Sequence, residues 1–178
     1  MRYRTIVADP PWPYDNDKWG VGAVSEEYET LSFEDICELP VATWAEKDAH
    51  LYLWVTNAKL LDYDYAQLVN AWGFSYKTCL TWHKTRCLGI GHYFRGETEH
   101  VLFCTRGRAS VPVERRQRNL FAAPRGRHSA KPESFYDLVE AVSDGPYLEM
   151  FARRARFGWH YWGNESLENA ELEVVRGL

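Results

Sequence analysis

The stretch from Ile6 to Trp12 constrains the fold of this chain most, because it determines where a buried strand must end. The short apolar run Thr5 to Ala8 predicts a β-strand inside the protein. Pro10 and Pro11 then remove two backbone donors and restrict φ, so strand pairing cannot continue past Asp9. We therefore expect Asp9 at the carboxyl edge of a strand, and open α/β sheets bind their ligands at that edge.

The residues of this corner suit a flat base that carries an exocyclic amine. The lone pair of such an amine is delocalised into the ring, so the nitrogen is a poor nucleophile. If the Asp9 carboxylate and a backbone carbonyl accept its two N–H bonds, the nitrogen becomes more tetrahedral and able to attack a methyl group. Trp12 would stack on the base, which supplies the proximity and alignment of in-line transfer. The alternative interpretation is a strand that ends in a Pro-Pro turn, with Trp12 as a core aromatic.

The length and composition predict a single domain over residues 1–178. A chain of 178 residues buries roughly 70% of its unfolded surface, enough for one sizeable core. The N-terminus lacks the apolar region of a signal peptide, and no apolar run approaches the ~18 residues of a membrane span. The four cysteines form no C-x-x-C pair and no zinc-type spacing. We therefore expect free thiols in a cytoplasmic protein that binds neither a membrane nor a metal.

Basic residues concentrate between Arg106 and Lys131, although the formal net charge of the chain is −4. Glu114 is the single acidic residue in this stretch. A run of charges usually marks a solvated loop of mixed sign, whereas here the sign is nearly pure. We therefore expect this stretch to contact the phosphates of a nucleic acid. The residues expected to do so are Arg115, Arg116, Arg118, Arg125 and Arg127.

The remaining sequence alternates between strand and helix patterns. Apolar runs predict further strands at 49–55, 74–84, 98–105, 147–151 and 159–162. Capping signals and helical spacing predict helices at 32–39, 58–72 and 132–142. A loop over the site is expected at 13–29, and an acidic, frayed tail at 165–178.

This alternation predicts a doubly wound α/β fold, with a mainly parallel sheet and helices on both faces. The carboxyl ends of parallel strands meet at one edge of the sheet. Lys84, Phe151 and Asn164 each follow a predicted strand, as Asp9 does. We therefore expect these residues to come together, with Lys84 on the substrate side.

Several ordered motifs resemble the MTA-seventy (METTL-type) family of adenine N6-methyltransferases. They are Asp9-Pro10-Pro11-Trp12, Leu53-Trp54-Val55-Thr56, His128-Ser129-Ala130-Lys131-Pro132, Glu149-Met150-Phe151-Ala152-Arg153 and Trp162-Gly163-Asn164-Glu165. The resemblance runs from about Tyr3 to Glu165. It implies S-adenosyl-L-methionine as the cofactor and a permuted Rossmann-like methyltransferase fold, in which the strand with the catalytic motif comes first.

The resemblance also implies roles for individual residues. Asp9 and Pro10 would hold the target amine, while Pro11 and Trp12 would shape the base pocket. Tyr28 matches a family tyrosine near the base. The residues implied at the cofactor are Asp9, Lys131, Phe151, Arg153, Asn164 and Glu165. Of these, Lys131 would lie near the cofactor's carboxylate or the substrate backbone.

The function expected from these features is S-adenosylmethionine-dependent methylation of adenine N6 in nucleic acid. We favour DNA over RNA, because the chain lacks the extensions of the eukaryotic mRNA enzymes. A target inside a duplex would have to be flipped out. The alternatives are an RNA methyltransferase and a non-catalytic nucleic-acid-binding partner of an active homologue. Transfer to cytosine N4 or a protein amide is a third, which Asp9 disfavours. Homo- and hetero-oligomers are both compatible with the sequence.

Overall fold

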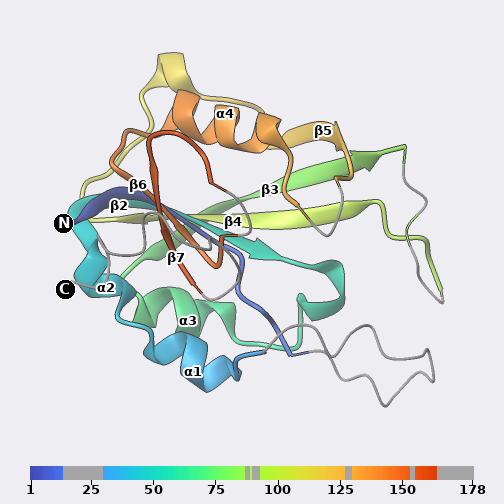
Figure 1. The fold of residues 1–178 in the computed structure, drawn as a ribbon, viewed down its shortest axis with the longest axis horizontal. Coiled ribbons are helices and arrows are strands. Elements are labelled where there is room, and N and C mark those ends of the chain that lie inside the picture. The colour runs from blue at the N-terminus through green and yellow to red at the C-terminus, as the bar shows by residue number, and fades with distance from the viewer. Residues whose placement is uncertain (14–29, 87–88, 90–92, 127–129, 153–154, 164–178) are drawn as a thin grey trace.

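The computed structural model describes residues 1–13, 30–86, 89, 93–126, 130–152 and 155–163. Within them, a seven-stranded sheet has the order β5-β3-β4-β2-β1-β6-β7 (Figure 1). The strands are β1 (Tyr3–Ala8), β2 (Ala45–Val55), β3 (Ser75–Thr85), β4 (Thr98–Arg106), β5 (Leu120–Pro124), β6 (Tyr147–Met150) and β7 (Trp159–Trp162). The motif strand β1 is therefore first in the chain and lies inside the sheet.

Among the described strands, β4 alone runs against the others. β1 pairs in parallel with β2 and β6, β6 with β7, and β3 with β5. β4 pairs antiparallel with both β2 and β3. The predicted Rossmann-like, mainly parallel α/β fold is confirmed, and Lys84 does lie at the same edge as Asp9. The reversal also brings the first residues of β4 to that edge.

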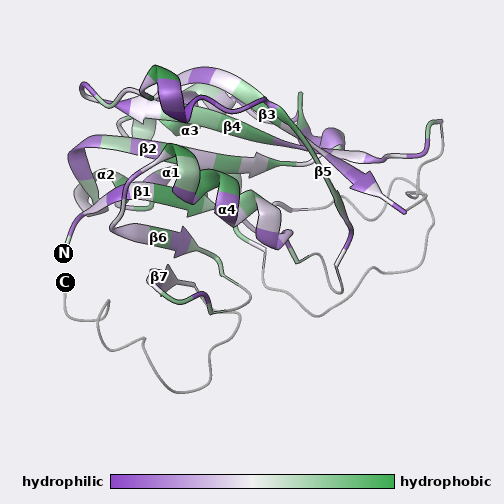
Figure 2. Ribbon diagram, turned by 90° about the horizontal axis from the view of Figure 1, so that it is seen from above, coloured by the Kyte–Doolittle hydropathy of each residue, from purple (hydrophilic) through white to green (hydrophobic). Residues whose placement is uncertain are grey.

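Helices cover both faces of the sheet, as predicted. The helices α1 (Phe33–Glu38) and α3 (Tyr65–Ala71) lie below the sheet in Figure 1, and α4 (Glu133–Val142) lies above it. The short helix α2 (Val41–Trp44) leads into β2. Figure 2 shows hydrophobic residues along β1, β4 and α4, which form the interior of these layers.

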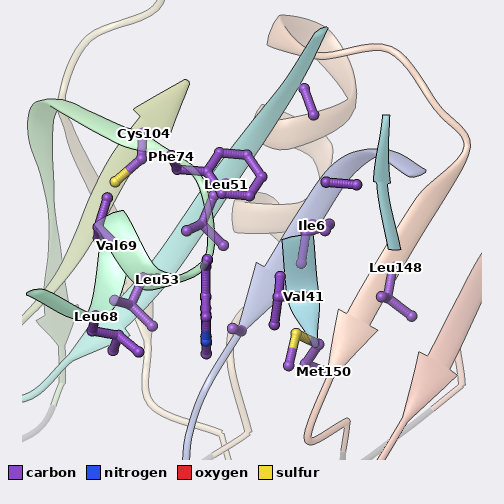
Figure 3. Close-up of a cluster of buried hydrophobic side chains, with 14 of the residues drawn as sticks. Ile6, Val41, Leu51, Leu53, Leu68, Val69, Phe74, Cys104, Leu148 and Met150 are labelled. Carbon is purple, nitrogen blue, oxygen red and sulfur yellow. The ribbon is translucent and has the colours of Figure 1, made fainter. Parts of the chain in front are cut away.

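The alternation of side chains along the central strands divides the core into two layers. Ile6, Leu51 and Leu53 point to the face of the sheet that α1 and α3 cover (Figure 3). Val7 and Tyr52 point to the other face, where they pack under α4. Because both faces are covered, β1 is continuously apolar from Ile6 to Ala8 and β2 from Leu51 to Val55. The same packing fixes the ends of these strands and so the position of the carboxyl edge.

The helix predicted at 58–72 is wrong in its first half. Asn57–Lys59 form a short 3-10 helix, η2, and the α-helix begins only after Asp64. The Asp64 side chain caps α3 by accepting a backbone N–H of its first turn at 3.0 Å. Asn57, directly before the predicted helix, instead donates its amide to the carbonyl of Thr98 at 3.1 Å. A partner from the distant strand β4 thus replaced the local cap.

No strand was predicted between 106 and 131, and the structure corrects this. Residues Val113–Arg115 form a 3-10 turn, η3, and Leu120–Pro124 pair in parallel with the second half of β3. This strand has only five residues and no clear alternation of polar and apolar side chains. Its pairing comes from the edge of β3, which the local sequence cannot reveal.

Some expectations concern residues outside the part that the structure describes, namely the loop at 14–29 and the tail at 165–178. Within the described part, Cys37, Cys79 and Cys104 are free thiols. No helix there has both the length and the apolar character to cross a bilayer. No group of histidine, cysteine, aspartate and glutamate side chains in the same part is arranged to hold a metal ion.

The two-layer core yields a stability prediction. Leu53 is 0% exposed, so Leu53→Ala leaves a cavity between β2 and the helices below it. We expect the free energy of unfolding to fall by about 2–5 kcal/mol, measured by urea denaturation. The matched control is Leu61→Ala, at a side chain 97% exposed, which should change it by less than about 0.5 kcal/mol. Similar losses in both variants would contradict this packing.

Candidate active site

Four charged side chains from distant parts of the chain meet at the carboxyl edge of the sheet. The Nζ atom of Lys131 lies 3.0 Å from Oδ2 of Asp9 and 3.1 Å from Oε2 of Glu99. The other oxygen of Glu99 accepts from Nζ of Lys84 at 2.5 Å. The four side chains form a chain of ion pairs, called here the charged cluster: Asp9, Lys131, Glu99 and Lys84.

Each member of the charged cluster is placed by a different element. Asp9 follows β1, and its backbone N–H donates to the Met150 carbonyl at the end of β6 (3.4 Å). Lys131 precedes α4, Lys84 is near the end of β3, and Glu99 is near the start of β4. Only the antiparallel direction of β4 brings Glu99 to this edge. The cluster therefore depends on the whole sheet and on the docking of α4.

Lys131 and Glu99 of the charged cluster stay ionised although they are largely shielded from water. Burial by itself would lower the pKa of Lys131, but the Asp9 and Glu99 carboxylates outweigh it and raise that pKa above its ordinary value. Burial would raise the pKa of Glu99, but Lys131 and Lys84 together bring it below its ordinary value. The positive and negative charges balance, as buried ionic groups require.

Aromatic rings line the buried side of the charged cluster. Nζ of Lys131 lies 4.6 Å from the centre of the Trp54 ring, and Nζ of Lys84 lies 5.3 Å from that of Trp82. The two indoles pack edge to face at 6.0 Å. Trp54 Nε1 and Thr56 Oγ1, at the end of β2, are buried and have no hydrogen-bond partner in the described part of the chain. Buried polar atoms of this kind are costly unless a ligand or water satisfies them.

The structure corrects the role expected for Trp12. Its side chain is 3% exposed, its ring stacks on Tyr63 at 5.5 Å, and its Nε1 donates to the Trp54 carbonyl at 3.3 Å. Both ring faces are therefore committed to the core, so stacking of a base on Trp12 is not supported and the core-aromatic interpretation is confirmed. The buried ring instead anchors the corner that follows Asp9.

The Pro-Pro corner is held by backbone hydrogen bonds. The Trp12 N–H donates to the Pro10 carbonyl at 2.8 Å, and the Leu31 N–H donates to the Pro11 carbonyl at 3.3 Å. A carbonyl oxygen has two lone pairs, so that of Pro10 can accept one more hydrogen bond. The corner thus presents the Asp9 carboxylate and a backbone acceptor on a stiff support.

The ends of β6 and β7 meet beside Asp9. Phe151 has a positive φ of 63°, and its N–H donates to the Trp162 carbonyl at 2.6 Å. Gly163 has a φ of 135°, and a Cβ there would lie 2.9 Å from Phe151 Cα. This close approach requires glycine at position 163. Phe151 is therefore at the predicted edge, in a conformation that residues other than glycine seldom adopt.

Five of the predicted site residues lie outside the described part of the chain. They are Tyr28, Arg127, Arg153, Asn164 and Glu165. Their expected contacts with the base, the phosphates or the cofactor stay predictions.

The arginine stretch does not act as a single surface. Nη1 of Arg115 lies 2.6 Å from Oδ1 of Asp144, which precedes β6 at the opposite edge of the sheet, so Arg115 is not part of the site. Exposed Arg116 and Arg118 precede β5, whereas exposed Arg125 follows β5 and lies at the edge that carries Asp9. The strand β5 separates these residues, and the sequence did not reveal it.

Two residues with ion-pair roles, Glu99 and Arg156, were not predicted from the sequence. Glu99 had no local signal, since its role follows from the direction of β4. Arg156 lies in the segment between β6 and β7, and its guanidinium binds carboxylates of α4: Glu140 at 2.9 Å, Asp137 at 2.8 Å and Glu133 at 2.5 Å. Hydrogen bonding to Glu140 raises the pKa of Arg156 further. This residue ties the segment before β7 to α4.

The charged cluster predicts a pH dependence. Because the pKa of Glu99 in the folded state is below its ordinary value of 4.5, its stabilisation is complete above about pH 4.5 and is lost as the pH falls through the folded pKa. Glu99→Gln should lower the free energy of unfolding at pH 7 by about 2 kcal/mol or more, since it leaves the two lysines undercompensated. The variant should also lose less stability than the parent between about pH 5 and pH 3.

Urea unfolding across this pH range measures both effects. Glu97→Gln is the matched control, because the Glu97 side chain is half exposed and lies 3.8 Å from His83. It should change the free energy of unfolding at pH 7 by less than about 1 kcal/mol. Equal pH profiles for the parent and Glu99→Gln would disprove the ionised cluster.

Comparisons with known proteins identify relatives of this chain. The type II methyltransferase M.MunI of Mycoplasma sp is 30% identical over 193 residues, which cover 97% of this chain and 81% of that protein. The N(6)-adenine-specific methyltransferase METTL4 of Homo sapiens is 29% identical, and the match covers 93% of this chain and 38% of that protein. The N6-methyladenosine RNA methyltransferase MTA1 of Cryphonectria parasitica is 30% identical, and the match covers 94% of this chain and 53% of that protein.

This chain thus spans most of M.MunI but about half or less of the METTL4 and MTA1 relatives. A family model described as MT-A70 matches residues 3–165. This range includes the Asp-Pro-Pro-Trp motif, the charged cluster and the ends of β6 and β7. The match covers far more than half of the sequence, and the protein therefore belongs to the MT-A70 family of methyltransferases.

Proposed function

We propose that this protein transfers the methyl group of S-adenosyl-L-methionine to N6 of adenine in nucleic acid, with DNA as the preferred substrate. The observation that carries the proposal is the position of Asp9. Lys131 holds this carboxylate at the carboxyl edge of the sheet, directly before the stiff Pro-Pro corner. The family and the names of the relatives support the same activity.

The residues at this edge are suited to hold an amine and to stabilise the charge it acquires. Oδ2 of Asp9 binds Lys131, which leaves Oδ1 for one N–H of the adenine amine. The Pro10 carbonyl accepts the other N–H with its second lone pair. When the nitrogen gains a methyl group it becomes cationic. The nearby carboxylate then stabilises that charge and accepts the proton that the nitrogen releases.

The described residues fit the proposed cofactor. When bound, S-adenosylmethionine supplies an electrophilic methyl group on a sulfonium, and its amino acid part carries a carboxylate. Lys131 offers a buried ammonium to such a carboxylate. Trp54 Nε1 and Thr56 Oγ1, which lack partners among the described residues, are polar groups that can form hydrogen bonds nearby. Phe151 provides an apolar contact surface. Arg153, Asn164 and Glu165 are proposed to complete the site at the ribose and at the edge of β7.

The extent of the matches supports the choice of DNA in this proposal. M.MunI, a type II methyltransferase, matches over most of its own length, whereas the relatives named as RNA methyltransferases match over about half of theirs. We further propose that residues 1–178 act as a single domain in the cytoplasm, since the free thiols of Cys37, Cys79 and Cys104 suit a reducing compartment.

Replacement of Asp9 tests the proposed chemistry. Asp9→Asn keeps the shape but loses the charge that pairs with Lys131 and stabilises the cationic nitrogen, so methyl transfer should fall by at least about a hundredfold. The assay follows label from S-adenosylmethionine into N6-methyladenine, identified by mass spectrometry of the digested nucleosides. The matched control is Asp144→Asn, also an ion-paired aspartate but at the opposite edge, and it should retain activity. Full activity in Asp9→Asn would refute the proposal.

The same assay on oligomers of matched sequence decides the substrate. We expect faster transfer to DNA than to RNA. If transfer to RNA is faster, RNA is the preferred substrate, and the proposed chemistry at Asp9 is unchanged. Binding of oligomers without transfer to either would instead support the non-catalytic alternative.

A further inference from the structure

The connection between β3 and β4 presents exposed aromatic side chains. Phe94 is 91% exposed, and Tyr93 beside it is 83% exposed. Single exposed apolar residues are common on protein surfaces and need no explanation. Two adjacent large exposed rings in a connection next to the site indicate a binding surface. Their position and the charges near them indicate which kind of ligand this surface binds.

Backbone contacts place this connection beside the charged cluster. The Lys84 N–H donates to the Glu97 carbonyl at 2.7 Å, which continues the pairing of β3 and β4 toward the connection. Five residues of chain lead from Phe94 to Glu99, a reach of at most about 18 Å. Successive bases along a duplex lie about 3.4 Å apart, so Phe94 is within about five base-pair steps of a base held at the cluster.

A glycine contact closes the base of the connection. A Cβ on Gly89 would overlap the carbonyl oxygen of Gly96, so the two backbones touch at this point. Phe94 lies between these glycines in the sequence, beyond the point of closure. Figure 1 shows the described residues just before β4 reaching past the ends of the strands. The aromatic pair is thus carried on a supported projection of the sheet.

Three exposed arginines lie on segments at the same edge of the sheet as the aromatic pair. Arg95 follows Phe94 directly, Arg86 follows the end of β3, and Arg125 follows the end of β5. Arg86 and Arg125 come after Thr85 and Pro124, which are paired in the sheet, so they lie side by side. All three arginines are exposed. Among the described neighbours Glu97 is acidic, and it lies 3.8 Å from His83.

Exposed rings among cationic side chains match nucleic acid, where bases stack on rings and phosphates bind guanidinium groups. A protein partner of ordinary composition would not need this excess of positive charge. The charged cluster is largely buried, so an adenine that is paired in a duplex cannot reach Asp9 until it leaves the stack. Turning it out leaves a gap between its neighbours, and filling that gap lowers the cost of extrusion.

We propose that Phe94, with Tyr93 beside it, stacks against the bases next to the target adenine and fills the space that this adenine leaves in a duplex. Arg86, Arg95 and Arg125 hold the flanking phosphates. The inference rests on the proposed function, because it assigns a role in presenting the substrate of that site. It makes Phe94 a positioning residue for duplex substrates, without contact to the reacting atoms.

The test compares Phe94→Ala with the parent on one target sequence, supplied as a duplex and as a single strand. Methylation of the duplex should fall by about tenfold, the effect of losing one base–aromatic stack, while methylation of the single strand changes less than twofold. Phe94→Trp should restore the duplex rate. The matched control is Phe157→Ala, at a fully exposed phenylalanine that leads into the start of β7, at the opposite edge. It should leave both rates unchanged.

A second measurement does not require methyl transfer. A duplex with 2-aminopurine at the target position should become more fluorescent when the parent protein turns the base out, and Phe94→Ala should weaken this signal. Equal losses on duplex and single strand, no loss in either, or a parent that acts on single strands alone would overturn the inference. So would a change of oligomeric state in Phe94→Ala, measured by light scattering, which would make the rings a protein contact. A parent that methylates neither form refutes the proposed function instead.

Discussion

The site depends on the ion pairs that Lys131 makes with Asp9 and Glu99. A buried ammonium is stable only if carboxylates compensate it, and each carboxylate is stable there only because the ammonium is present. The three groups come from the end of β1, the start of β4 and the residue before the cap of α4. The cluster thus forms only when β1 and β4 are assembled in the sheet and α4 has docked on it. The position of the Asp9 carboxylate therefore depends on the correct tertiary fold.

The direction of β4 shapes the edge on which these ion pairs form. In a sheet of parallel strands alone, the carboxyl edge would carry only residues that follow strands. The antiparallel strand contributes residues that precede or begin a strand, and these include Glu99 and the exposed aromatic pair before β4. The same reversal therefore supplies both the inner carboxylate, next to Lys131, and the outer projection with Phe94. The antiparallel direction of β4 is therefore the one structural feature on which both the proposed methyl transfer and the proposed binding of a duplex depend.

The two parts of this edge have different physical requirements. The inner part is buried, its charges are balanced, and indole rings line it, so it suits one flat group bound with fixed orientation. The outer part carries exposed rings and a net positive charge, so it suits a polyanion of any sequence. Affinity for nucleic acid arises mainly from contacts of the second type, and selection of one base arises from contacts of the first.

The amino-acid sequence by itself determined the class of the fold and the position of its most informative residue. The apolar runs at β1 and β2, the prolines after Asp9 and the capping residue Ser32 act through local geometry, so their consequences were predictable from neighbouring residues. The tertiary structure decided the pairing of β5, the late start of α3, the burial of Trp12 and the separation of Arg115 from the site. It also brought Glu99 to Lys131. These features depend on partners far away in the chain, and no local pattern encodes which strand edge, carbonyl or charge will lie opposite a given residue after folding.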